Sequence, residues 1–242
     1  LVGLLLLYLC SIYCTLIPLF FSPFPLFPSS LFLLRFDMLS SFLLPLLHPF
    51  ASSSLSAATI RGGPLANDVY ELSEVVFRWG SSNCKGAEHT LNGTWFTMEA
   101  QAIHFNKRYE TIDNCWDKRD GLAICAYFLQ AYQVPTWDEH PLFSKITDDL
   151  HKVTQPDSCI KLSPSMPPSQ ACQTPGYYTY LGSITTFPFH ECVTWIVFPE
   201  PVRISENQTE LFRMIRDKQG MCIKENYREV QKLGGRVVYY VN

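Results

Sequence analysis

The pattern of hydrophobic and polar positions changes near residue 56. From Leu1 to Leu34 apolar residues run together without any formal charge, and Arg35 and Asp37 are the only charged residues before Arg61. Beyond residue 56 charged and apolar positions are mixed, as in a folded domain whose surface meets water. The sequence therefore predicts two segments, a hydrophobic leader at 1–55 and a folded domain at 56–242.

The leader admits three interpretations. Its uncharged run exceeds the roughly 20 apolar residues that cross a bilayer, although Pro18, Pro23 and Pro25 would each remove a backbone donor inside lipid. A signal peptide is the second interpretation. The third is a mistranslated segment, because Phe, Leu, Ser and Pro dominate it and their codons are mainly pyrimidine-rich. A membrane is a predicted partner only if the leader is genuine.

The domain has the pattern of a β-rich protein. Apolar or alternating runs with many aromatic and β-branched residues predict strands at 70–79, 121–129 and 192–198. Between residues 90 and 96, the pair Asn92-Gly93 is typical of a tight hairpin turn.

Helical patterns are fewer. Leu211, Phe212 and Ile215 have helical spacing within 206–216, and residues 142–153 form a second candidate. Together these elements predict a mainly β fold with some α, in the α+β class.

The charge balance limits the partners. The chain has a formal net charge of −3 and 17% charged residues. A basic surface of the kind that binds nucleic acid is therefore not expected.

Several motifs follow one another through residues 58–242. They are Gly62-Gly63-Pro64-Leu65, Phe77-Arg78-Trp79-Gly80-Ser81-Ser82, Gly86-Ala87-Glu88-His89-Thr90, Tyr180-Leu181-Gly182-Ser183-Ile184-Thr185-Thr186, Glu191-Cys192-Val193-Thr194-Trp195-Ile196 and Asn226-Tyr227-Arg228. In this order they resemble the α-class carbonic anhydrase family. The resemblance implies a large, twisted, mostly antiparallel sheet. It also implies that the N-terminal part of the domain is missing, because residues 1–55 lack the family's early motifs.

The resemblance further implies a zinc ion held by three histidines, which lowers the pKa of a bound water to about 7. The matching positions here are Val76, Arg78 and Gln101. Valine has no donor atom, a guanidinium keeps its charge, and an amide oxygen is a weak ligand. We therefore expect no cofactor and no CO2 hydration.

These substitutions indicate a protein close in character to the acatalytic carbonic anhydrase-related proteins, with a binding role toward an unknown protein partner. The alternative is a zinc-dependent carbonate dehydratase with a non-standard metal site.

Other family positions are retained. Thr185 matches the threonine that orients zinc-bound hydroxide, Glu88 the carboxylate that accepts its hydroxyl proton, and Glu99 a partner of a zinc-bound histidine; Thr186 matches a neighbouring pocket residue. The apolar wall for CO2 is matched by Ile103, Ile124, Ile184, Val193 and Trp195.

Arg78 introduces a charge that must be compensated. A buried guanidinium is costly unless it is paired. We predict an ion pair from Arg78 to Glu99 or Glu88. His89 and His104 match histidines that are structural in the family, and Phe187-Pro188 matches a position where the peptide bond is cis.

The compartment stays undetermined at this level. Cys10 and Cys14 lie in the leader, and the odd number of domain cysteines fits either a reduced compartment or loop disulfides with one thiol left over. Asn92 and Asn207 begin glycosylation sequons, which matter only after secretion. The protein would be secreted or membrane-anchored if the leader is genuine, and cytoplasmic otherwise.

Overall fold

A computed structural model describes residues 59–151 and 176–242. The interpretations of the leader concern residues outside this range. No helix within the described ranges is long and apolar enough to span a membrane.

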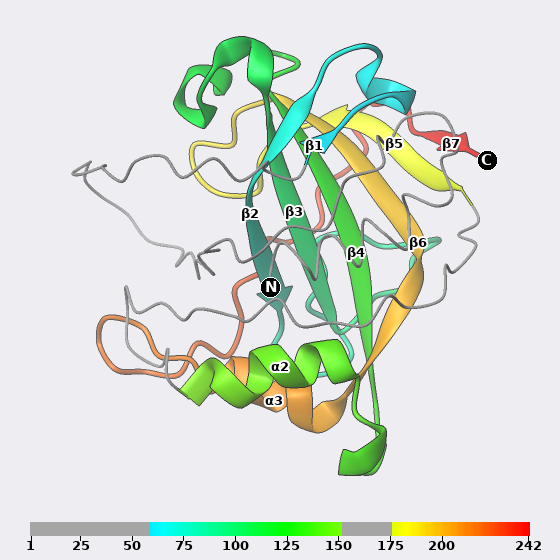
Figure 1. Cartoon of the computed structure of the whole chain (residues 1–242). Coiled ribbons are helices and arrows are strands. Elements are labelled where there is room, and N and C mark those ends of the chain that lie inside the picture. The colour runs from blue at the N-terminus through cyan, green and yellow to red at the C-terminus, as the bar shows by residue number, and fades with distance from the viewer. Residues whose placement is uncertain (1–58, 152–175) are drawn as a thin grey trace, which may run out of the picture.

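A seven-stranded sheet dominates the described structure (Figure 1). In spatial order its strands are β1 (Thr59–Ile60), β2 (Tyr70–Trp79), β3 (Met98–Asn106), β4 (Leu122–Tyr132), β6 (Val193–Ser205), β5 (Tyr177–Gly182) and β7 (Tyr239–Val241). Every neighbouring pair is antiparallel except β4 and β6, which are parallel. The predicted mainly β, mostly antiparallel architecture is confirmed. Strands lie at all three predicted places, but β4 continues three residues and β6 seven residues beyond the predicted ends.

Strand alternation gives the sheet two different faces. On β2, Phe77 and Trp79 belong to one apolar cluster, whereas Val76 and Arg78 point to the opposite face. The first cluster takes residues from β2, β3, β4 and β6. A second cluster, on the other face, is built around β4 and β6 and includes Ile124.

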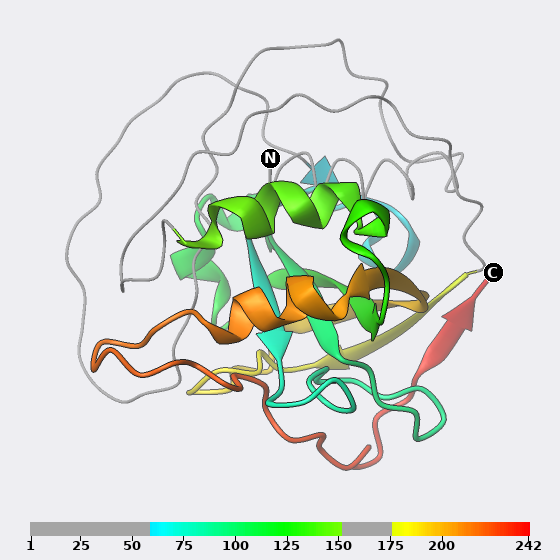
Figure 2. The ribbon, with the colours of Figure 1, turned by 90° about the horizontal axis from the view of Figure 1, so that it is seen from below.

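Two helices cover the first face (Figure 2). They are α2 (Pro141–Leu150) and α3 (Glu206–Arg213), and they contact each other. Phe212 on α3 is fully buried, with its ring centroid 5.2 Å from that of Phe77. We call this side of the sheet the helix-covered face.

Both helices were predicted. Helix α2 begins one residue earlier than expected and ends at Leu150, and the last two residues of its predicted range, 152–153, lie outside the described residues; α3 ends three residues earlier than expected. The amide of Ile215 donates to Phe212 O, and the amide of Ile223 donates to Ile215 O, so the chain turns away from the helix axis. At its start α3 has a capping box. Ser205 Oγ accepts a hydrogen bond from the Gln208 backbone amide, and the side-chain oxygen of Gln208 accepts one from the Ser205 backbone amide.

Short 3-10 helices complete the described elements: η1 (Gly63–Leu65), η2 (Lys107–Tyr109), η3 (Ile112–Cys115) and η4 (Thr136–Asp138).

Two local predictions from the sequence are confirmed. Asn92 and Gly93 have positive φ angles of 50° and 80°, and Leu91 and Thr94 exchange backbone hydrogen bonds around them, as in a tight hairpin turn. The Phe187-Pro188 peptide bond is cis.

Candidate functional site

A small cavity of about 70 Å³ lies against β2, β3 and β4, on the face opposite the helices. It is lined by eight of the residues singled out from the sequence: Val76, Arg78, Gln101, Ile103, Ile124, Ile184, Thr185 and Thr186. Register explains the meeting, because Val76 pairs with Gln101 across β2 and β3 while Ile103 pairs with Ile124 across β3 and β4.

The other predicted residues lie around this cavity. Glu88 and Glu99 are buried behind Gln101, which bonds to both. Trp195 and Val193 belong to the apolar cluster of this face but do not line the small cavity; Trp195 borders a larger cavity of about 320 Å³, and Val193 another.

Arg78 forms the predicted buried ion pair. Its side chain is 4% exposed, and its Nε lies 3.4 Å from Glu88 Oε1. That Nε has no hydrogen-bond partner among the described residues, so the pair is held by charge rather than by an aligned hydrogen bond. Of the two carboxylates open to it in the sequence, Arg78 pairs with Glu88.

Gln101 joins the two buried carboxylates. Its amide nitrogen donates to Glu88 Oε2 at 2.7 Å and to Glu99 Oε1 at 2.9 Å. Both amide hydrogens are therefore committed to carboxylates. A neutral donor between two carboxylates reduces the cost of burying both.

Glu99 is paired with His89 and not with Arg78. The two residues are joined by a 2.9 Å contact from His89 Nδ1 to Glu99 Oε1, and the His89 amide donates to Glu99 Oε2. Burial alone would raise the pKa of Glu99, but the charge and hydrogen bond of His89 lower it. Burial likewise opposes the charge on His89, and Glu99 outweighs it and raises the pKa of that imidazole.

Tyr180 completes this chain of contacts, since its hydroxyl lies 2.6 Å from His89 Nε2. The sequence placed Tyr180 only within a motif and gave no sign of this contact.

His104 lies apart from these residues. Its Nδ1 bonds to Ala102 O, and burial lowers its pKa to about 4. Both histidines are hydrogen-bonded inside the structure, as expected.

One expected contact is different. Among the described residues no hydrogen bond joins Thr185 to Glu88. Glu88 Oε2 instead accepts from Gln101, and Oε1 accepts from the Arg228 amide and faces Arg78. Both oxygens of Glu88 are thus engaged by Gln101, the Arg228 amide and Arg78.

The donor set at this cavity does not fit zinc. Val76 offers no donor atom, Arg78 brings a positive charge, and Gln101 directs its amide nitrogen, not its oxygen, at the two carboxylates. In the ranges the structure describes, no group of three or more His, Cys, Asp or Glu side chains is arranged to hold a metal ion.

Comparison with known proteins defines the class. A family model for eukaryotic-type carbonic anhydrases matches residues 48–242. The chain therefore belongs to that family, and the resemblance seen in its motifs is confirmed. The match begins somewhat before the predicted domain start at residue 56.

Individual relatives agree with this assignment. Carbonic anhydrase 7 of Mus musculus is 39% identical over 184 residues, covering 74% of this chain and 67% of that protein. Carbonic anhydrase 7 of Homo sapiens is 38% identical over the same shares. Carbonic anhydrase 1 of Oryctolagus cuniculus is 36% identical over 193 residues, or 76% of this chain and 77% of that protein.

Proposed function

We propose that this chain is an acatalytic member of the carbonic anhydrase family, which does not hydrate CO2 and acts by binding a protein partner. The observation that carries the proposal is the buried Arg78–Glu88 pair at the base of the small cavity, where Gln101 also bridges Glu88 to Glu99. Arginine, valine and glutamine stand at the positions that match the family's three zinc histidines.

The chemistry of the reaction supports this proposal. Hydration of CO2 near neutral pH needs a cation that coordinates water and lowers its pKa to about 7. A guanidinium carries charge but has no lone pair to give a metal and no vacant orbital to accept a water oxygen. Arg78 can therefore replace part of the electrostatic role of zinc toward Glu88 without generating a nucleophile.

Charge repulsion argues in the same direction. A permanent guanidinium charge within a few ångströms of a divalent cation is strongly unfavourable when both are buried. Arg78 would have to leave the cavity before zinc entered, and Glu88 would lose its ion-pair partner.

The experiment is stopped-flow CO2 hydration by the full chain, purified after expression in zinc-supplemented medium. We expect the uncatalysed buffer rate, with no change on adding acetazolamide. Acetazolamide-sensitive hydration by a homogeneous sample would overturn the proposal and favour a carbonate dehydratase with a non-standard metal site.

A matched pair of variants makes the result interpretable. The triple variant Val76→His/Arg78→His/Gln101→His places imidazoles on paired strands in the register of the site, so we expect it to gain zinc. The effect of Arg78 itself is isolated by comparing Val76→His/Gln101→His, which keeps the guanidinium, with Val76→His/Arg78→Met/Gln101→His, which has the same two imidazoles without it; the first should bind zinc far more weakly. Equal zinc binding by both variants would mean that Arg78 is not what opposes the metal.

A further inference from the structure

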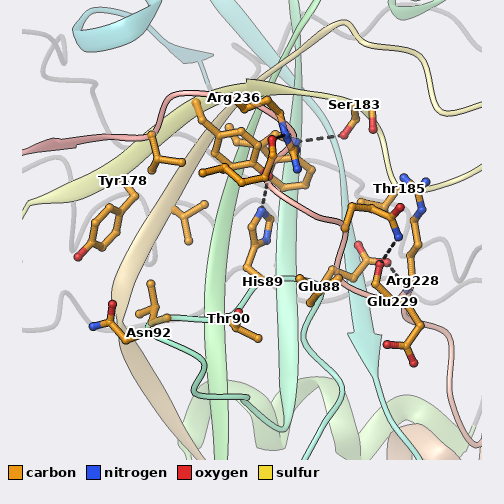
Figure 3. Close-up of a pocket in the computed structure, with 18 residues that line it drawn as sticks. Glu88, His89, Thr90, Asn92, Tyr178, Ser183, Thr185, Arg228, Glu229 and Arg236 are labelled. Carbon is orange, nitrogen blue, oxygen red and sulfur yellow. Dashed lines mark hydrogen bonds between the residues drawn. The ribbon is translucent and has the colours of Figure 1, made fainter.

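A second cavity, of about 320 Å³, is bordered by Glu88 and Thr185 (Figure 3). Thr185 borders both cavities, whereas Arg78 and Gln101 border only the small one. The cavity is made by β5, β6, the loop through His89 and Asn92, and the segment 228–238. Its size lies at the lower end of small-molecule sites, which span about 300–1,000 Å³.

One wall of this cavity is apolar and aromatic. Tyr180 and Trp195 stack with their ring planes 10° apart and centroids at 6.3 Å, and Tyr178 and Val197 continue the wall. Leu233 and Val238 also line the cavity, with apolar side chains that are 55% and 42% exposed. Flat rings and branched aliphatic groups of this kind favour a flat apolar ligand body.

The charged side chains of the cavity are unbalanced. Arg228 and Arg236 both border it and are half-buried, and neither makes an ion pair with any residue in the described ranges. In Figure 3 Arg236 lies above His89, and Arg228 lies beside Glu88 and Glu229.

The two acidic residues that border the cavity are already neutralised. Glu88 faces Arg78, and Glu229 is bonded to Lys85 at 2.8 Å.

The two guanidinium groups are held in place without being neutralised. Arg236 Nε donates to Leu233 O, and its guanidinium lies 5.4 Å from the centre of the Tyr180 ring. Arg228 lies 3.9 Å from the centre of the Phe189 ring. Carbonyl and ring contacts orient a guanidinium but leave its positive charge available to an anion.

From these two features, an aromatic wall and two arginines without an ion pair among the described residues, we infer that this cavity binds a small amphipathic carboxylate, with the ring body against the partly exposed Tyr178 and Tyr180 and the carboxylate on Arg236 and Arg228. This site is separate from the small cavity and does not depend on whether the chain hydrates CO2.

Isothermal titration of the full chain with 2-naphthoate tests the inference, and 2-naphthamide serves as a neutral probe of nearly the same shape. We expect naphthoate to bind and naphthamide to bind at least about tenfold more weakly, because charge-assisted hydrogen bonds to guanidinium are lost. No binding of naphthoate, or equal binding of the two probes, would overturn the inference.

Variants locate the site. Arg236→Gln and Arg228→Gln should each weaken naphthoate binding by about tenfold and leave naphthamide unchanged. Arg203→Gln is the matched control. Arg203 is on β6, lies over the Tyr132 ring at the end of β4, and does not border the cavity. Naphthoate binding that is insensitive to both cavity arginines would contradict the inference. The probe comparison on the unaltered chain decides the question if a variant does not fold.

Discussion

The two faces of the central sheet bury different kinds of side chains. The helix-covered face is closed by α2 and α3 with tightly packed rings such as Phe77 and Phe212. The other face buries charge, with Arg78 against Glu88 and two carboxylates bridged by Gln101. Neighbouring residues of one strand thus meet unlike surroundings, since side chains alternate across the sheet.

Two buried histidines show how these different surroundings shift a pKa. His104 pairs with Leu72 of the first cluster, and no charged group of the described residues pairs with its ring, so burial lowers its pKa to about 4. At His89 burial acts in the same direction, but the carboxylate of Glu99 raises the pKa instead. Burial alone does not decide the charge of a side chain; the partner brought by the fold does.

The largest expected effect is on the helix-covered face. Phe212→Ala removes a fully buried ring that contacts Phe77 and Trp79, and should lower the free energy of unfolding by about 3–5 kcal/mol. Denaturant unfolding of the full chain measures it. Phe187→Ala is the control, because Phe187 is 82% exposed and its loss should cost less than about 0.5 kcal/mol. Similar costs for both would mean that this face is not packed as described.

The next effect is on the charged face. Glu88→Gln leaves the Arg78 guanidinium buried without its counter-ion and should cost about 3–4 kcal/mol. Combining it with Arg78→Met removes the orphaned charge, so the double variant should be more stable than Glu88→Gln alone. Simple addition of the two single effects in a double-mutant cycle would contradict the ion pair.

Acid should act on the helix-covered face through His104. Its pKa is about 4 in the folded state and about 6.5 when unfolded, so the unfolded chain takes up a proton first. Its contribution is therefore present above pH 6.5 and is lost as the pH falls toward 4, by up to about 3 kcal/mol at 1.36 kcal/mol per pKa unit. Unfolding of the unaltered chain and of His104→Gln across pH 7 to 4 measures it, and parallel curves would contradict it.

The contribution of His89 to stability should depend on pH in the opposite direction. Because its folded pKa is raised, its contribution is present below about pH 6.5 and is lost as the pH rises through the folded value. The variant His89→Gln should therefore lose the most stability, relative to the unaltered chain, on the acidic side. A larger relative loss at alkaline pH would mean that Glu99 does not hold a charged imidazole.

The smallest expected effect is at the start of α3, on the helix-covered face. Ser205→Ala removes the side-chain acceptor at the start of α3 and should cost about 1 kcal/mol. Ser205→Asn, which retains a capping acceptor, is the matched comparison and should cost less. Denaturant unfolding distinguishes them.

The sequence predicted the features that depend on local interactions better than those that depend on the tertiary fold. Alternation located β2 at 70–79 to the residue, and the positive φ values that Asn92 and Gly93 tolerate gave the turn. Both signals are local. The family motifs then brought Val76, Arg78 and Gln101 to one place, and strand register confirms that they meet at one cavity.

The hydrogen-bond partners could not be predicted in the same way. Glu88 and Glu99 were equal candidates for Arg78 in the sequence; in the structure Glu99 is bonded to His89, and Arg78 faces Glu88. The arginines of the larger cavity come from a segment near the end of the chain, and their position beside Tyr180 follows only from the tertiary fold.

Zinc content tests most directly whether the buried Arg78–Glu88 pair stands in place of a metal beside the small cavity. The full chain, expressed with added zinc and passed over a chelating resin, would be measured by plasma mass spectrometry beside Val76→His/Arg78→His/Gln101→His. We expect far less than one zinc per unaltered chain and a gain in the triple variant. One tightly held zinc per unaltered chain, lost on replacing residues of this cavity, would contradict it.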